Sequence, residues 1–268
     1  MYAFDYHKVS SLEEARRLLG EHAEGKLLAG GMTLIPTLKM RLAAPSHMVD
    51  LGGIPGLKDI EVTDDAVTIG AMTPHASVAA SDAVRTAIPA LAVLAGGIGD
   101  QQVRHRGTIG GSVANNDPAA DYPAGCLGLG ATVVTDRREI AADAFFLGLF
   151  QTALEADEII TAIRFPRAET AAYVKFANPA SRYAIVGVFV SCGREGIRVA
   201  VTGAGENGVF RAAAIERALA ADFSEAALDQ VAIPPEGLFA DLHGTAEYRA
   251  HLIGVMAKRA VAACVQKK

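Results

Sequence analysis

The chain has 268 residues, of which 51% are hydrophobic, and its formal net charge at pH 7 is -5. A chain of this length and composition can bury a sizeable core, which excludes a disordered protein and leaves room for two modest domains. The acidic balance argues against a nucleic-acid surface, because counterion release needs clustered Lys and Arg, and the run Arg104-His105-Arg106 is too short to provide them.

The first residues lack the charged-then-apolar pattern of a signal peptide, and no apolar run approaches the length of a membrane span, so a cytoplasmic protein is predicted. Cys126, Cys192 and Cys264 lie far apart, without a Cys-x-x-Cys pair, and cannot assemble an iron-sulfur cluster or a structural zinc site. There is also no Gly-x-Ser-x-Gly elbow and no His-x-x-x-His pair. Hydrolase and metalloenzyme functions therefore lose their usual support, and no metal site is expected on this chain.

The first part of the chain predicts a strand, glycine turn, helix unit. A capping box starts a helix over 11–20, and a short strand over 26–29 then runs into a pair of glycines and a helix over 33–42. Next come a strand over 66–70 and a helix over 73–80, for which Thr73 is the expected N-cap.

The middle of the chain contains a helix over 88–94 and a stretch over 107–118 that is rich in small and polar residues. Such residues favour turns rather than regular elements, and a loop of this length in a compact domain is usually functional. Strands over 131–135 and 158–165 follow, and 166–169 forms a plausible boundary.

After the boundary the pattern changes to strands over 183–191 and 197–202, followed by helices over 211–220, 224–231 and 248–265. Strands first and helices last are typical of a separate α+β domain.

Two glycine-rich stretches carry the clearest chemical signal. The first glycine segment is Ala29-Gly30-Gly31-Met32-Thr33, and the second is Thr108-Ile109-Gly110-Gly111-Ser112. Each is expected to bring bare backbone N-H groups against an anion such as a diphosphate, so a side chain at Gly110 would occupy the space of a phosphate oxygen. Neither stretch is the Gly-x-Gly-x-x-Gly fingerprint or a Walker loop. Paired glycines also make simple tight turns, and one segment alone could contact the ligand.

These segments and their surroundings resemble a known family, the FAD-binding medium subunits of carbon monoxide dehydrogenase and xanthine dehydrogenase, which are molybdenum hydroxylases. The resemblance covers essentially the whole chain and is strongest at Leu28-Ala29-Gly30-Gly31-Met32-Thr33-Leu34-Ile35-Pro36, at Ile69-Gly70-Ala71-Met72-Thr73, and at Val103-Arg104-His105-Arg106-Gly107-Thr108-Ile109-Gly110-Gly111-Ser112. Relatives often have Gln or His and then Ser after the first double glycine. This chain has Met32-Thr33, so any contact by residue 32 is expected through its backbone.

The resemblance implies an α+β fold with a two-part FAD-binding domain of the vanillyl-alcohol oxidase (PCMH) type, followed by a smaller α+β C-terminal domain. The first domain would span residues 1–168, with subdomains of about 1–55 and 56–168, and the second would span residues 169–268.

The resemblance also implies a set of cofactor-binding positions and no catalytic residue on this chain. The positions are Leu28, Ala29, Gly30, Gly31, Met32, Thr33, Leu34, Ile35, Thr73, Ile98, Thr108, Gly110, Gly111, Ser112, Asn115, Asp117, Asp121, Ile160, Lys175 and Tyr183. At four of these positions an ordinary structural role is an alternative to cofactor binding. Asp121 could instead cap a helix, Ile160 could be core, Lys175 could be a surface charge, and Tyr183 could lie on an edge strand.

The implied function is a relay. A small partner subunit would carry two [2Fe-2S] clusters, a large one would carry the molybdenum cofactor, and FAD on this chain would pass electrons to an external acceptor. The subunits would assemble as a dimer of heterotrimers. A self-contained flavin oxidoreductase and a scaffold without cofactor are the alternatives. The substrate and the acceptor are not readable from this chain.

Overall fold

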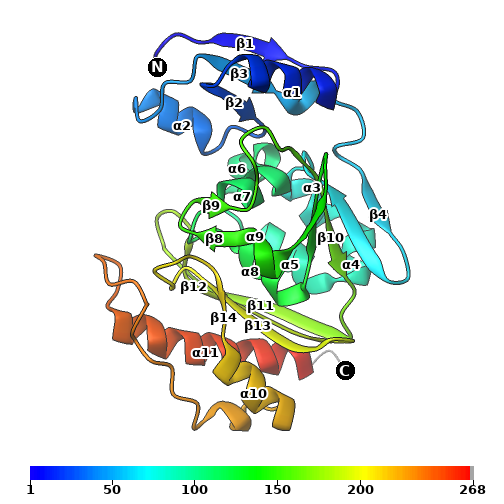
Figure 1. Ribbon diagram of the computed structural model, residues 1–268. Helices are drawn as coiled ribbons and strands as arrows, with labels where there is room; N and C mark the ends of the chain where they lie inside the picture. Colours follow the sequence, from blue (N-terminus) through cyan, green and yellow to red (C-terminus); the bar gives the residue numbers. More distant parts are fainter. Residues whose placement is uncertain (266–268) are drawn as a thin grey trace.

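The computed structural model describes residues 1–265, and within them Figure 1 shows three layers stacked from the N-terminus to the C-terminus. The described strands form sheets of three, five and four strands and one two-stranded hairpin. No helix among these residues is both long and apolar enough to cross a membrane.

The N-terminal lobe is a small parallel sheet of strand order β1-β3-β2, with α1 packed on it. The hydroxyl of Ser11 accepts a hydrogen bond from the backbone N-H of Glu14 at 3.1 Å, so the predicted N-cap of the first helix is confirmed. The elements of this lobe are β1 (Asp5–Lys8), α1 (Leu12–Glu21), β2 (Gly25–Leu28), α2 (Leu34–Lys39), β3 (His47–Asp50) and the 3-10 turn η1 (Leu51–Gly53).

The middle layer is an antiparallel sheet of strand order β4-β5-β10-β6-β7, packed with short helices. All nine residues of α8 are buried, so this helix forms the centre of the core. The elements are β4 (Ile60–Val62), β5 (Ala66–Gly70), α3 (His75–Ala80), α4 (Asp82–Ala87), α5 (Pro89–Gly96), α6 (Gln101–Arg106), α7 (Ile109–Asn115), α8 (Asp121–Leu129), β6 (Thr132–Thr135), β7 (Glu139–Ala141), α9 (Ala142–Phe145), β8 (Phe146–Gly148), β9 (Gln151–Thr152) and β10 (Ile160–Pro166).

The C-terminal layer is an antiparallel sheet of strand order β11-β12-β13-β14, with the long helix α11 on one face and α8 on the other (Figure 1). Its elements are β11 (Thr170–Ala177), β12 (Ala184–Gly193), β13 (Gly196–Thr202), β14 (Phe210–Arg211), α10 (Ala213–Ala221), the 3-10 turn η2 (Ala226–Leu228) and α11 (Ala246–Val265).

Two predicted helices are shorter in the structure than the sequence indicated. The predicted helix over 33–42 stops at Lys39, because Arg41 adopts a left-handed conformation (φ 60°) and Leu42 turns into solvent with 73% of its surface exposed. The predicted helix over 224–231 shrinks to the single turn η2, where the Ser224 hydroxyl accepts a hydrogen bond from Ala227 N and competes with helix formation.

The stretch over 107–118 is not the turn region that its composition predicts, because it contains the helix α7. The Thr108 hydroxyl caps this helix by accepting from Gly111 N at 3.2 Å, and Asn116 ends it in the left-handed conformation (φ 44°). Thr73 is not the N-cap of α3, since Pro74 occupies that position and makes no side-chain capping bond. The sequence analysis also missed β11, which pairs with β12 along its whole length.

Residues of β12 alternate between two cores. Val186, Val188 and Val190 pack into the core beneath α11, whereas Phe189 points the other way into the core around α8. The ring of Phe189 presses so closely on α8 that a Cβ at Gly128 would lie 2.5 Å from its Cδ1 atom. Phe189 is therefore a large apolar contact between the C-terminal sheet and the middle layer.

We expect Phe189→Ala to lower the free energy of unfolding by about 3–5 kcal/mol, because it removes a fully buried ring and leaves a cavity between two layers. Urea denaturation followed by circular dichroism measures this change. Leu147→Ala is the control, since Leu147 is 62% exposed, and it should change the stability by less than about 0.5 kcal/mol. Equal effects of the two substitutions would contradict the role of Phe189.

Candidate functional site

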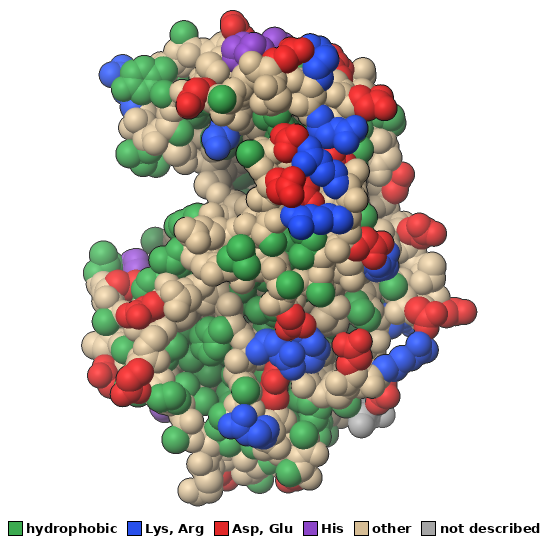
Figure 2. Space-filling view, in the orientation of Figure 1, with side chains coloured by type: hydrophobic (Ala, Val, Ile, Leu, Met, Phe, Trp, Pro, Cys, Tyr) green, Lys and Arg blue, Asp and Glu red, His purple; other side chains and the backbone are tan. Residues whose placement is uncertain are grey.

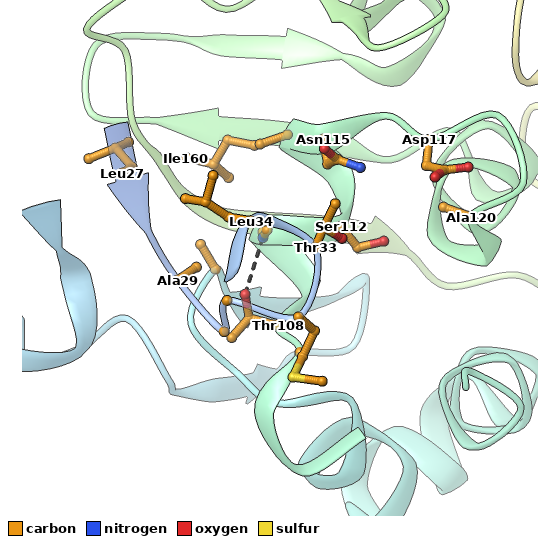
Figure 3. Close-up of a pocket in the computed structure, with 18 of the residues that line it drawn as sticks. Leu27, Ala29, Thr33, Leu34, Thr108, Ser112, Asn115, Asp117, Ala120 and Ile160 are labelled. Carbon is orange, nitrogen blue, oxygen red and sulfur yellow. Dashed lines mark hydrogen bonds between the residues drawn. The ribbon is translucent and has the colours of Figure 1, made fainter. Parts of the chain in front are cut away.

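A cavity of about 670 Å³ lies between the N-terminal lobe and the middle layer. Figure 2 shows the molecule hollowed between these two parts. Figure 3 shows Leu27 and Ile160 toward one end of the cavity and Asp117 and Ala120 toward the other. The site is therefore elongated, with an apolar end next to β2 and β10 and a polar end next to α8.

The two glycine segments lie directly against each other on one wall of this cavity. A Cβ at Gly30 would lie 2.1 Å from the carbonyl oxygen of Arg106 and 2.8 Å from Gly107 Cα, so any side chain there would push the N-terminal lobe away. Gly31 adopts φ +73°, a conformation that other residues rarely take. Both positions therefore need glycine: Gly30 for its close approach to Arg106 and Gly107, and Gly31 for its left-handed backbone conformation.

The second glycine segment does not present the bare N-H groups that its sequence predicts. Gly110 N donates to Ala71 O at 2.8 Å, and Gly111 N donates to the Thr108 hydroxyl (Figure 3). A Cβ at Gly110 would lie 2.5 Å from Ala71 Cβ, so a side chain there would strike the turn after β5 rather than a phosphate. The expected backbone anion site at Gly110 is therefore wrong, because this glycine is needed for packing.

The backbone N-H groups that are free to bind an anion lie in the first glycine segment instead. Within residues 1–265, the backbone N-H groups of Gly30, Gly31, Met32 and Thr33 form no hydrogen bond. Across the cavity, the Ser112 hydroxyl and the Asn115 amide likewise have no partner in the described part of the chain. The cavity thus offers a row of unused backbone donors facing two polar side chains, an arrangement suited to an anionic ligand.

Asp121 is buried at the polar end, where it takes part in a compact network. It begins α8, and its carboxylate accepts hydrogen bonds from the Tyr173 hydroxyl and from Lys175, whose Nζ lies 2.9 Å from Oδ1. Burial raises the pKa of Asp121, while Lys175 and Tyr173 oppose that rise. Asp121 is therefore the first residue of the helix rather than its N-cap.

Lys175 is not the solvated surface charge that its residue type favours. Its side chain is only 10% exposed, and Nζ also donates to Gly97 O at 2.8 Å and to Arg182 O at 3.0 Å. It does not line the cavity. Instead it ties the loop after α5 and the turn before β12 to Asp121.

Tyr183 lines the cavity close to Thr33 of the first glycine segment. Burial raises the pKa of its hydroxyl, with smaller contributions from the negative charges of Asp117 and Asp121, and the nearby Thr33 side chain lowers it. The turn before β12 in this way reaches across to the N-terminal lobe.

Most of the predicted site residues line this cavity, although they come from all three layers of the molecule. They are Ala29, Gly30, Gly31, Met32, Thr33, Leu34, Ile98, Thr108, Gly110, Gly111, Ser112, Asn115, Asp117, Asp121, Ile160 and Tyr183. Four predicted residues lie behind the wall rather than on it, and these are Leu28, Ile35, Thr73 and Lys175. Ile35, for example, packs its Cγ1 atom on Gly31, 2.9 Å from where a Cβ would be.

Other residues of the cavity wall were not predicted from the sequence. They include the apolar Leu27 and Leu154, the loop residues Gly99 and Arg182, and His75 at the start of α3. Leu27 and Leu154 look like ordinary core residues in the sequence, so periodicity alone could not identify them. His75 did carry a signal, because it lies two residues after the segment Ile69–Thr73 that supports the family resemblance.

Comparison with known proteins identifies the family. The model of the "FAD binding domain in molybdopterin dehydrogenase" matches residues 2–168. The carbon monoxide dehydrogenase medium chain of Hydrogenophaga pseudoflava is 36% identical over 96% of each chain, and the nicotine 6-hydroxylase medium subunit of Paenarthrobacter nicotinovorans is 35% identical over 97% of this chain and 96% of that one. The chain belongs to this family.

Comparison with solved structures supports the same family assignment. A chain of reconstituted CO dehydrogenase from Oligotropha carboxidovorans superposes with a TM-score of 0.92 at 34% identity, covering 99% of both chains. The predicted fold class, an α+β protein with a FAD-binding domain of the PCMH type, is thereby confirmed. The chain is an oxidoreductase subunit that binds FAD.

The residues present fit this cofactor. A diphosphate needs closely approaching donors, and the unused N-H groups of the first glycine segment supply them without an intervening Cβ at Gly30 or Gly31. An elongated cavity with an apolar end at Leu27 and Ile160 also suits a ligand with a ring at each end of a polar linker.

We expect Gly30→Ala to abolish FAD binding, because its Cβ would meet the Arg106 carbonyl and separate the two glycine segments. Flavin absorbance of the purified chain measures occupancy, and circular dichroism checks that the chain is folded. Gly20→Ala is the matched control, since no atom lies within 4 Å of a Cβ at this helical position. Full FAD occupancy in Gly30→Ala would show that the contact between the segments is not needed.

Proposed function

We propose that this chain is the electron relay of a molybdenum hydroxylase complex, holding FAD so that electrons pass from the [2Fe-2S] clusters of a partner subunit to an external acceptor. The observation that carries the proposal is the cavity formed by two touching glycine segments in a chain of the FAD-binding family. When bound, a flavin exchanges two electrons with one partner and single electrons with another, which couples hydride chemistry to iron-sulfur carriers.

The chain's own residues bind and orient the cofactor in this proposal. The backbone N-H groups of Gly30, Gly31, Met32 and Thr33 hold the diphosphate, and Ser112 and Asn115 supply hydrogen bonds from the opposite wall. Ile98, Leu34 and Ile160 provide apolar surface. Leu28, Ile35, Thr73 and Lys175 act indirectly, by fixing the backbone behind the residues that touch FAD.

A second cavity of about 330 Å³ supports access by an external acceptor. It shares Asp117, Ser181 and Tyr183 with the large cavity, so the two cavities lie next to each other at Tyr183. The second cavity is lined by Asp241, His243 and Arg249 as well, which give it polar groups for an acceptor. We therefore place the acceptor in this second cavity, next to Tyr183.

The proposed partners are a large subunit with the molybdenum cofactor and a small subunit with two [2Fe-2S] clusters, assembled as a dimer of heterotrimers in the cytoplasm. The names of the relatives as medium chains and medium subunits support this assembly. The proposed domains are 1–168, with subdomains of about 1–55 and 56–168, and 169–268. The end of the family match at residue 168 and the gap between β10 and β11 support that boundary.

We predict that the purified chain binds FAD non-covalently. Covalent attachment usually needs a His, Cys or Tyr at the flavin ring, and neither glycine segment contains one. Acid precipitation should leave all flavin in the supernatant, where it can be measured by absorbance. Flavin retained in the pellet would contradict the prediction, and a chain that never binds flavin would favour the scaffold without cofactor.

We also predict that organic substrates will not bleach the flavin of the isolated chain under anaerobic conditions, but will bleach it once the iron-sulfur and molybdenum subunits are added. Substrate oxidation belongs to a partner in this proposal, so the chain alone has no route from substrate to flavin. A panel of aldehydes, N-heterocycles and carbon monoxide tests this by flavin absorbance. Rapid bleaching of the lone chain by any of them would favour a self-contained flavin oxidoreductase.

A further inference from the structure

His75 is held directly behind the second glycine segment. It begins α3, and its backbone N-H donates to Gly107 O at 3.0 Å. The neighbouring Pro74 forms a β-bridge with Thr108, and Ile109 N donates to Thr73 O at 3.1 Å. Three successive residues are thus paired with the backbone that leads into α7, which fixes the position of the imidazole relative to the cavity.

The imidazole of His75 is buried and yet belongs to the cavity wall. The residue is 4% exposed, and its Nδ1 atom has no hydrogen-bond partner within residues 1–265. Its Nε2 atom lies 2.6 Å from the point where Gly107 would carry a Cβ. Gly107 is in turn the residue on which Gly30 packs, so Nε2 lies one residue behind the contact between the two glycine segments.

The surroundings of His75 disfavour a positive charge on its imidazole. Burial, and after it the positive charge of Arg104 on α6, lower the pKa of His75 to about 4. Tyr122 of α8 lies with its ring 5.3 Å away, and α5 carries no titratable side chain. Asp82 and Arg85 of α4 pair with each other on the surface. The imidazole is therefore neutral at pH 7 when the cavity holds only water.

We propose that His75 is a cofactor-contacting residue whose Nε2-H donates a hydrogen bond to a phosphate oxygen of FAD. This inference rests on the proposed function, because it needs FAD in the large cavity. A neutral imidazole has one N-H, and no acceptor lies within reach of Nδ1 in the described residues, so a proton on Nε2 is the tautomer whose N-H can find a partner. The phosphate oxygen then accepts this N-H on the side of the glycine segments.

A pH dependence follows from the same contact. A diphosphate carries negative charge, so its presence beside Nε2 favours the protonated imidazole and raises the pKa of His75 above its value in the empty chain. At a pH between the two pKa values, FAD binding therefore takes up a proton. The affinity is highest below about pH 4, where His75 is protonated both before and after binding. It falls as the pH rises from there through the pKa of the complex, so the dissociation constant should increase with pH over this interval.

The test uses the full chain after removal of FAD, with isothermal titration of FAD in two buffers of different ionisation enthalpy at several pH values. The variants are His75→Leu, which removes the donor, and His75→Gln, which keeps an N-H at similar reach. His105→Leu is the matched control, because His105 is an exposed histidine on α6 that hydrogen-bonds Gln101 O and does not line the cavity.

We expect His75→Leu to bind FAD roughly 10- to 100-fold more weakly, His75→Gln to recover part of this loss, and both to lose the proton uptake of the parent chain. His105→Leu should behave like the parent. Unchanged affinity and unchanged proton uptake in both variants would overturn the inference. If the variants do not fold, the absence of proton uptake by the parent chain would overturn it as well. A parent chain that binds no FAD would instead overturn the proposed function.

Discussion

The close approach of Gly30 to the Arg106 carbonyl is the constraint on which the site depends. No other residue fits there, since a Cβ would lie 2.1 Å from that oxygen. The contact draws the N-terminal lobe onto the middle layer and places the unused N-H groups of the first glycine segment opposite Ser112 and Asn115. One wall of the cofactor cavity is therefore made by contact between two segments far apart in the chain.

The C-terminal layer supports this arrangement from the other side. Phe189 fixes its sheet to α8, and Lys175 on β11 joins Asp121 at the start of that helix to two backbone carbonyls, those of Gly97 and Arg182. Buried charged groups are tolerated here because each has its opposite charge and its hydrogen bonds. The sheet thus supports the cavity indirectly, through α8 and through the turn that carries Tyr183.

The sequence predicted the strands and helices whose signals are local, such as the capped first helix and the alternating strand over 66–70. It failed where long-range packing decides the outcome. The stretch over 109–115 looks like a turn, yet it forms a helix that Thr108 caps and that packs on Ala71 at Gly110, where a larger side chain would not fit. Most of the residues that the family resemblance implies line the cavity, but the resemblance could not separate them from Thr73 and Lys175, which do not line it.

The position of Tyr183 has a consequence for the folding of the chain. Tyr183 brings the turn before β12 close to Thr33 of the N-terminal lobe, at the edge of the cavity. The cavity wall is therefore built from all three layers, and it is complete only when the whole chain has folded. A ligand that binds such a wall stabilises the folded state of the entire chain and not of one lobe alone.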